Sequence, residues 1–362
     1  MTWKWIVGPA GGGWSDELTE ARNRKAVWRL TDPSTTTCSI DGRHEQARLV
    51  DELSTDLHVL RDGQQLLRAR VGATTDTLDG DTHEVGINAA DYRELLRRRL
   101  LYADSTLMYA GADQGDIAWE LLSDTQRRTA GDLGIARGPG AATGRRRDRT
   151  YEPGNSIGSR IDELSQVIDG FDWDVLATSP SALSLNIWHP QRGADRGVIL
   201  DYGGAVASLT RTVDPRDYAN AGRYSGGEGT TPVNREAPDL ASRPEGRWDT
   251  QQGDTDLTQQ AALAERADSL AVTARTLTPS YTLALADGWW QGPDHVWLGD
   301  TCRVVIHSGR LAVDTALRVV ELTADVDESG EERISVTLGA PPLSAVRRQR
   351  EQASRLTTLE RR

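Results

Sequence analysis

The segment Gly-Asn-Ser-Ile-Gly at residues 154–158 is the first candidate for chemistry, because it matches the Gly-x-Ser-x-Gly pattern. In hydrolases this pattern holds a nucleophilic serine on a strained turn between a buried strand and a helix. A helix is predicted after Ser156, but the preceding Thr-Tyr-Glu-Pro-Gly-Asn is a poor buried strand. Two hypotheses follow, a hydrolase that uses Ser156 and a serine that caps a helix. We favour the helix cap.

A pair of carboxylates, Asp172 and Asp174, lies on one face of a predicted strand. Two carboxylates can act as acid and base in glycoside hydrolysis. The other face carries Phe171, Trp173 and Val175, so the aspartates are more simply explained as the solvated side of a half-buried strand.

Trp289 and Trp290 stand in a predicted turn, where exposed indole rings could stack on a sugar. The predicted strands contain Trp3, Trp5, Trp28, Trp173, Trp188 and Trp297. For these six, packing in a core is the default explanation. A glycan-binding surface at Trp289 and Trp290 is therefore a third hypothesis.

The sequence predicts no metal site, no cofactor site and no catalytic residue. His44-Glu45 begins like a zinc-protease helix, but Arg48 occupies the position of the second histidine. The glycine-rich segments lack the Gly-Lys-Ser/Thr ending of a phosphate-binding loop. Cys38 and Cys302 lie far apart, so we expect two buried free thiols.

Composition limits the remaining classes. The formal net charge of −12 argues against tight nucleic-acid binding, which needs clustered cations. No apolar run approaches the roughly 18 residues needed to cross a bilayer. The arginines at 145–149 are a local exception, which we interpret as a solvated loop within residues 136–155.

The elements that must position these residues begin with a hairpin at residues 56–71. Apolar and polar residues alternate strictly around Asp62-Gly63, a typical hairpin turn. The face expected to lie on a core consists of Leu57, Val59, Leu67, Ala69 and Val71. The opposite face is mostly charged, so we expect a half-buried sheet with this face toward solvent.

The order of elements predicts a β-rich α+β fold with an inserted module. Strand patterns fill residues 1–90, helical patterns interrupt them, and strand patterns resume near residue 196. Apolar residues at helical spacing predict a further helix at 256–277, which Pro279 ends. The predicted parts are a discontinuous first β domain (1–90 with 196–226), an inserted α+β module (91–195), a linker (227–249), a helix with a second β domain (250–340) and a C-terminal tail (341–362).

Several motifs occur here in a familiar order. They are the Gly-to-Gly segment at 42–63, D-Y-x-x-L-L at 91–100, G-N-S-I-G at 154–164, G-F-D-W-D-V at 170–175 and H-P-x-x-G at 189–193. Together they resemble tail-hub proteins (minor tail or baseplate-hub proteins) of long-tailed bacteriophages, in particular siphophages of actinobacterial hosts. The resemblance covers about residues 35–225.

The resemblance implies that the two β domains are small tube-type β-barrels and that the chain is a structural protein, not an enzyme. Three copies would then present six barrels, so that a homotrimer could adapt a sixfold tail tube to a threefold tip. The acidity suits a DNA conduit that must not grip its cargo.

The implied partners are two further copies, the distal tail protein ring or tail tube, the tape-measure protein and other tail-tip proteins, with transient passage of DNA and no specific binding. The implied location is the virion tail tip, after assembly in the host cytoplasm. Candidate docking residues in the C-terminal tail are Leu343, Val346, Leu356 and Leu359. The alternatives are a virion-associated hydrolase (Ser156, or Asp172 with Asp174) and a receptor- or glycan-binding tail module.

Overall fold

Strands dominate the N-terminal part of the chain. The structure is a computed structural model that describes residues 2–102, 105–140, 142–167, 169–254 and 259–339. The first strands are β1 (Trp3–Pro9), β2 (Asp16–Glu17), β3 (Arg22–Arg29), β4 (Thr35–Asp41), β5 (Thr55–Arg61), β6 (Gln64–Asp79) and β7 (Thr82–Asp91). A short 3-10 helix, η1 (Glu45–Leu49), lies between β4 and β5.

The hairpin at residues 56–71 is confirmed as β5 and β6, which pair antiparallel. Asp62 and Gly63 both have positive φ angles, 50° and 82°, as the turn requires. The inner face is buried as predicted, but the expectation for the outer face was wrong. Every residue of β5 is buried, the polar Asp56 and His58 included.

The inserted segment has a core of its own. Its elements are α1 (Tyr92–Arg98), β8 (Leu107–Asp113), α2 (Gln114–Gln126), β9 (Ile135–Arg137), β10 (Arg146–Tyr151), α3 (Ile157–Ser165), β11 (Asp172–Ala177) and β12 (Leu183–Trp188). Side chains of all three helices and of the β11–β12–β9 sheet meet in one apolar cluster. The arginine-rich stretch, expected as a loop, contains β10, because its backbone pairs with β8.

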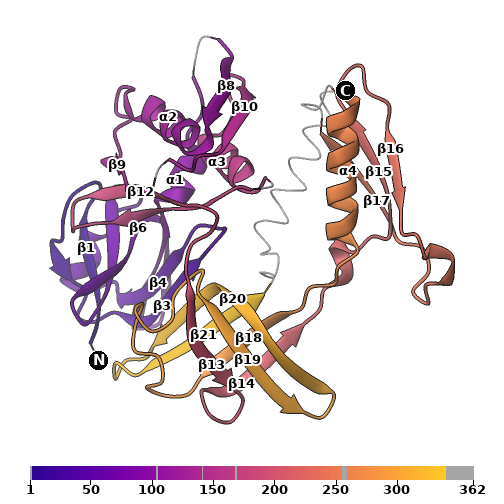
Figure 1. Cartoon of the computed structure of the whole chain (residues 1–362). Helices are drawn as coiled ribbons and strands as arrows, with labels where there is room; N and C mark the ends of the chain where they lie inside the picture. Colours follow the sequence, from indigo (N-terminus) through magenta and orange to yellow (C-terminus); the bar gives the residue numbers. More distant parts are fainter. Residues whose placement is uncertain (1, 103–104, 141, 168, 255–258, 340–362) are drawn as a thin grey trace. The chain divides into compact units, whose positions relative to one another are not determined.

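The chain then returns to the large sheet through β13 (Asp195–Asp201), β14 (Val206–Thr212), β18 (Ser280–Leu285), β19 (Thr301–Ser308), β20 (Leu311–Val326) and β21 (Glu332–Gly339). Thirteen strands form this sheet, in the order β14-β18-β21-β20-β3-β4-β7-β6-β5-β1-β2, with β13 on β19 and β19 on β20. The sheet curls around its core (Figure 1). A β-rich α+β fold is thus confirmed.

The 16-residue strand β20 joins the N-terminal and C-terminal strands. Its first half pairs with β19, and its second half pairs with β21 on one side and β3 on the other. Segments about 300 residues apart in sequence therefore share one hydrogen-bonded sheet.

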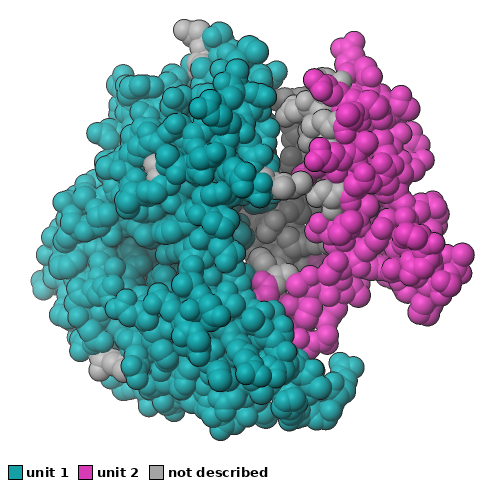
Figure 2. Space-filling view, viewed as in Figure 1, with its two compact units in different colours: residues 1–209, 282–338 teal, residues 210–281, 339–362 magenta. Residues whose placement is uncertain are grey.

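A second unit is built mainly from residues 210–281 (Figure 2). It contains η2 (Pro215–Asp217), β15 (Ala221–Gly226), β16 (Val233–Glu236), η3 (Leu240–Ser242), β17 (Asp249–Asp254) and α4 (Gln260–Ala274). Its small core comprises Tyr224, Leu263, Ala267 and Ala271.

This unit differs in two ways from the expected division of the chain. The stretch 227–249, expected as a linker, contains β16 and η3. The helix expected to accompany the second β domain packs on β15 and β16, because its buried Leu263 and Ala267 face Tyr224.

Both cysteines are buried and free, as predicted, and burial raises the pKa of the Cys38 thiol to about 12. Within the described ranges, no helix has the length and apolar character to cross a bilayer.

Candidate functional site

Ser156 is the N-cap of α3. Its Oγ accepts a hydrogen bond from the Ser159 N–H at 3.4 Å and donates one to the Arg97 carbonyl oxygen at 2.8 Å. The residues before it form a turn, not the buried strand that a nucleophile elbow needs. The structure therefore supports the helix cap.

Asp172 and Asp174 lie on β11, and arginines neutralise both. Asp174 Oδ2 accepts from Arg192 Nη1 at 2.9 Å, and Asp172 Oδ2 accepts from the Arg192 N–H at 2.6 Å and from the Arg318 guanidinium. Asp174 is buried, so the interpretation of a solvated face was wrong for this residue. The pair holds together the end of the module and β20.

Trp290 is 1% exposed, so it cannot stack on a sugar at the surface. Its ring lies 6.4 Å from that of Trp3 and 6.2 Å from that of Trp297, and the guanidinium of Arg61 sits 4.6 Å from its centroid. Trp289 is half-buried against His295. The turn belongs to the core that joins the N-terminal strands to the C-terminal part of the large sheet.

The other candidates add no reactive centre. Within the described part of the chain, no group of His, Cys, Asp or Glu is arranged to hold a metal ion. His44 caps η1 by accepting from the Gln46 N–H. The docking candidates Leu343, Val346, Leu356 and Leu359 lie outside the described residues.

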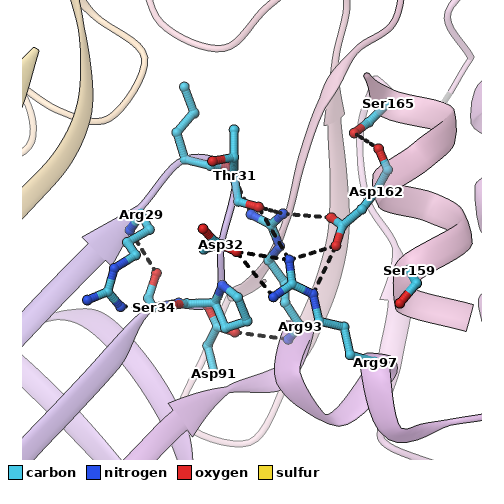
Figure 3. A network of polar contacts seen from close by, with 12 residues as sticks. Arg29, Thr31, Asp32, Ser34, Asp91, Arg93, Arg97, Ser159, Asp162 and Ser165 are labelled. Atoms are coloured by element: carbon cyan, nitrogen blue, oxygen red, sulfur yellow. Dashed lines mark hydrogen bonds and ion pairs between the residues drawn. The ribbon is translucent and has the colours of Figure 1, made fainter. Parts of the chain in front are cut away.

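An ionic network joins the large sheet to the inserted module (Figure 3). Arg93 and Arg97 project from α1 toward Asp162 of α3 and toward the loop between β3 and β4. Arg93 Nη2 lies 3.0 Å from Asp162 Oδ1, and Arg97 Nη2 lies 2.7 Å from Asp162 Oδ2. One buried carboxylate thus receives two guanidinium groups.

The same arginines also grip the β3–β4 loop. Arg93 donates to the carbonyl oxygens of Leu30 and Thr31 at 2.9 and 3.0 Å, and Arg97 pairs with Asp32 at 3.3 Å. Beneath them, the face of Trp173 lies 4.4 Å from the Arg93 guanidinium. The module is therefore held at a fixed position on the sheet by directional bonds.

Asp91 begins α1 and continues this network. Its carboxylate accepts from the N–H groups of Ser34 at 2.7 Å and Arg93 at 3.0 Å. Burial, and to a smaller extent the nearby Asp174 carboxylate, raise the pKa of Asp91 to about 7 against the lowering effect of Arg93. The helix cap is thus a titratable group placed in the joint.

A second polar cluster lies on the outer face of the hairpin. Asp56 accepts from Arg68 at 2.8 Å, from Arg70 at 2.6 Å and from the Tyr92 hydroxyl of α1 at 2.7 Å. Burial alone would raise the pKa of Asp56, but Arg70, Tyr92 and Arg68 outweigh it and lower the pKa. This cluster is the reason why a charged strand face can be buried.

His58 lies beside this cluster and is fully buried. Its Nδ1 contacts Gln65 Nε2 at 3.2 Å, while its Nε2 has no hydrogen-bond partner. Burial, together with the charge of Arg68, lowers the pKa of His58 to about 4. The imidazole is therefore neutral at pH 7.

These clusters favour fixation over catalysis. Asp162, Asp56 and Asp174 are each committed to guanidinium groups, and Ser156 donates to a carbonyl. Such an arrangement sets the position of one part of a protein on another.

Comparison with known proteins identifies the fold. No protein-family model matches this sequence, and no curated protein matches it significantly. Among solved structures, a tail protein from Neisseria meningitidis MC58 has a TM-score of 0.62 at 12% identity, over 94% of this chain and 97% of that one. The 43 kDa tail protein of prophage MuSo2 from Shewanella oneidensis gives 0.63 at 11% identity, over 92% and 97%.

The prophage tail protein gp18 from Listeria monocytogenes is also similar, with a TM-score of 0.57 at 12% identity over 98% of this chain and 99% of that one. All three are tail proteins, and two come from prophages. The chain has a phage tail-type fold along nearly its whole length.

Sequence reasoning missed the residues of the network. Arg93 and Arg97 stand at helical spacing beside the apolar residues of α1, and Asp162 directly follows the buried Ile161. A charged residue adjacent to an apolar stripe is a weak signal, since only the fold shows that these charges face one another.

Proposed function

We propose that this chain is a structural protein of a phage tail, namely a homotrimeric hub at the distal end that adapts a sixfold tail tube to a threefold tip. The observation that carries the proposal is the fold similarity to tail proteins, which extends over 94% of this chain and 97% of the Neisseria protein. A similarity of this extent covers the large sheet and the inserted module together.

A repeated strand arrangement supports the two similar halves that such an adaptor needs. β5, β6 and β7 are consecutive antiparallel strands, and so are β19, β20 and β21. The central strand has 16 residues in each set. We propose that the two sets are the cores of two tube-type barrels, so that three copies present six.

The proposed partners are the distal tail protein ring or tail tube, the tape-measure protein and further tail-tip proteins. The chain would line part of the DNA conduit without binding DNA, in keeping with its net charge of −12. The proposed location is the virion tail tip after assembly in the host cytoplasm, and an actinobacterial siphophage origin stays a prediction. The role is structural, because the candidate catalytic residues serve as a cap and as ion-pair partners.

The test is the mass of the purified chain by light scattering, together with electron microscopy of intact tails. We expect a trimer and a ring with six similar domains at the tail end. A protein that stays monomeric at every concentration and is missing from virions would contradict the proposal. Loss of a cell-wall hydrolysis activity in Ser156→Ala would favour the enzymatic alternative.

A further inference from the structure

A basic ribbon lies at the outer end of the inserted module, where β8 and β10 form a two-stranded sheet (Figure 1). Residues 145–149 carry four arginines and one aspartate in an otherwise acidic protein. The ribbon is well defined, since Gly111 has a φ of +58° and its N–H donates to Asp148 Oδ1 at 2.7 Å. These two residues fix a β-bulge, which determines where the neighbouring arginines point.

The two faces of the basic ribbon differ. Leu107, Tyr109 and Tyr151 pack on the module, and Arg147 Nε donates to Gln114 Oε1 at 3.0 Å. The other face is open to solvent, with Arg146 exposed and Met108 80% exposed. An exposed methionine among arginines is typical of a protein-docking surface.

A second ribbon of opposite charge projects from the large sheet. It is the distal half of the β6–β7 hairpin, residues 73–84, and its acidic residues are Asp76, Asp79, Asp81 and Glu84. No lysine or arginine occurs between residues 71 and 92. Leu78 of this acidic ribbon is 74% exposed. Beyond Val71, β6 pairs with β7 on one side. Its other edge pairs with no strand among the described residues.

We propose that the basic ribbon of one copy docks on the acidic ribbon of the next copy around the ring. The inference rests on the proposed trimer, and it assigns the two surfaces that would build a heterologous, closing interface. The opposite charges would fix the head-to-tail orientation of neighbouring copies. Met108 of one copy and Leu78 of the next would supply an apolar contact. A second copy fits better than a DNA phosphate backbone, because each ribbon exposes a large apolar side chain and the chain carries the complementary charges itself.

The experiment is a charge swap on the full chain. The first variant is Arg145→Glu with Arg146→Glu, and the second is Asp79→Arg with Asp81→Arg. All four side chains are exposed, so folding should persist, and circular dichroism checks this. We expect each variant to raise the trimer dissociation constant at least tenfold in sedimentation equilibrium at low salt. A mixture of the two variants cannot close a ring, whereas the four changes combined in one chain should restore the trimer.

The control variant is Arg310→Glu, which changes an exposed arginine in the β19–β20 turn and should leave the trimer intact. Three outcomes would overturn this inference alone. In the first, wild type and both variants are equally trimeric, which leaves the hub proposal standing. In the second, the combined variant fails to reassemble. In the third, wild type binds a short DNA duplex at physiological salt through Arg145 and Arg146 while assembly is unaffected. A wild type that is monomeric at every concentration and is missing from virions would contradict both proposals.

Discussion

The two joints of the large unit use the same parts in different proportions. At the module joint, Arg93 lies 4.4 Å from the Trp173 ring and pairs with Asp162. At the aromatic joint, which connects N-terminal and C-terminal strands of the large sheet, Arg61 lies 4.6 Å from the Trp290 ring and pairs with Glu332 at 2.8 Å. The first joint adds more ions and loop carbonyls around this pair, and the second adds more indole rings.

The two joints contribute to the fold in different ways. In the aromatic joint, Trp3, Trp28, Trp290 and Trp297 bury large apolar surfaces, which stabilises the curled sheet. In the ionic joint, hydrogen bonds to the loop between β3 and β4 fix orientation and depend on every partner being present. The aromatic joint thus contributes mainly to stability, and the ionic joint fixes the position of the inserted module on the large sheet.

The largest expected effect is on the aromatic joint. Trp290→Ala should lower the free energy of unfolding by about 4 kcal/mol, because it removes a buried indole and leaves a cavity beside Trp3 and Arg61. Denaturant unfolding measures the change. The matched control is Trp248→Ala, since Trp248 is 44% exposed and should cost far less.

The ionic joint should fail in a different manner. Arg93→Met keeps the side-chain length but deprives Asp162 of one cation. It also removes the Arg93 donor from the Leu30 carbonyl and leaves the Thr31 carbonyl with only the longer bond from Arg97, for a loss of about 3 kcal/mol. We also expect faster proteolysis within the module than in the large sheet. Arg98→Ala, on the exposed side of the same helix, should cost about 0.5 kcal/mol or less. Equal losses for the two arginines would refute the distinction between the joints.

Two buried titratable groups, His58 beside the hairpin cluster and Asp91 in the ionic joint, should give opposite pH dependences. The pKa of His58 is about 4 in the folded state, below its usual 6.5, so below pH 6.5 the unfolded chain binds a proton that the folded chain does not. His58 therefore contributes stability that is present above pH 6.5 and is lost toward pH 4. As pH falls from 7 to 5, the free energy of unfolding of His58→Gln should rise by about 2 kcal/mol relative to that of wild type.

Asp91 should act in the opposite sense over the same range. Its folded pKa is about 7, above the ordinary 3.8, so the folded chain binds the extra proton and stability falls as pH rises from about 4 to 7. Asp91→Asn keeps a side chain that can cap the helix. Its free energy of unfolding should therefore rise relative to that of wild type as pH rises. Urea unfolding of wild type, His58→Gln and Asp91→Asn at pH 5 and pH 7 measures both pH dependences. Parallel changes in the stability of all three proteins would contradict the two predictions.

The smallest expected effect concerns Ser156. Ser156→Ala removes a cap and the bond to the Arg97 carbonyl, so it should cost about 1 kcal/mol. Assembly into tails should be unchanged. Ser156→Thr, which keeps the hydroxyl, should recover most of the stability.

The sequence predicted the elements whose signals are local. Asp62-Gly63 predicted the hairpin because both residues accept positive φ. Ser156 predicted a helix start because its side chain can cap free N–H groups.

The sequence did not predict which polar residues lie inside. Asp56 and Arg68 alternate with apolar residues as solvated charges would, yet the module covers them. The four-residue core around Tyr224 was missed because its strands are short and polar.

By itself, then, the chain determined its turns, its helix caps and the alternation of its strands, since each depends on residues a few positions apart. Only the tertiary structure decided that β20 pairs with β3, that two arginines meet at Asp162 and that a charged strand face is buried. The physical reason is distance along the chain. An ion pair becomes favourable in the interior only when segments tens to hundreds of residues apart have already excluded water around it.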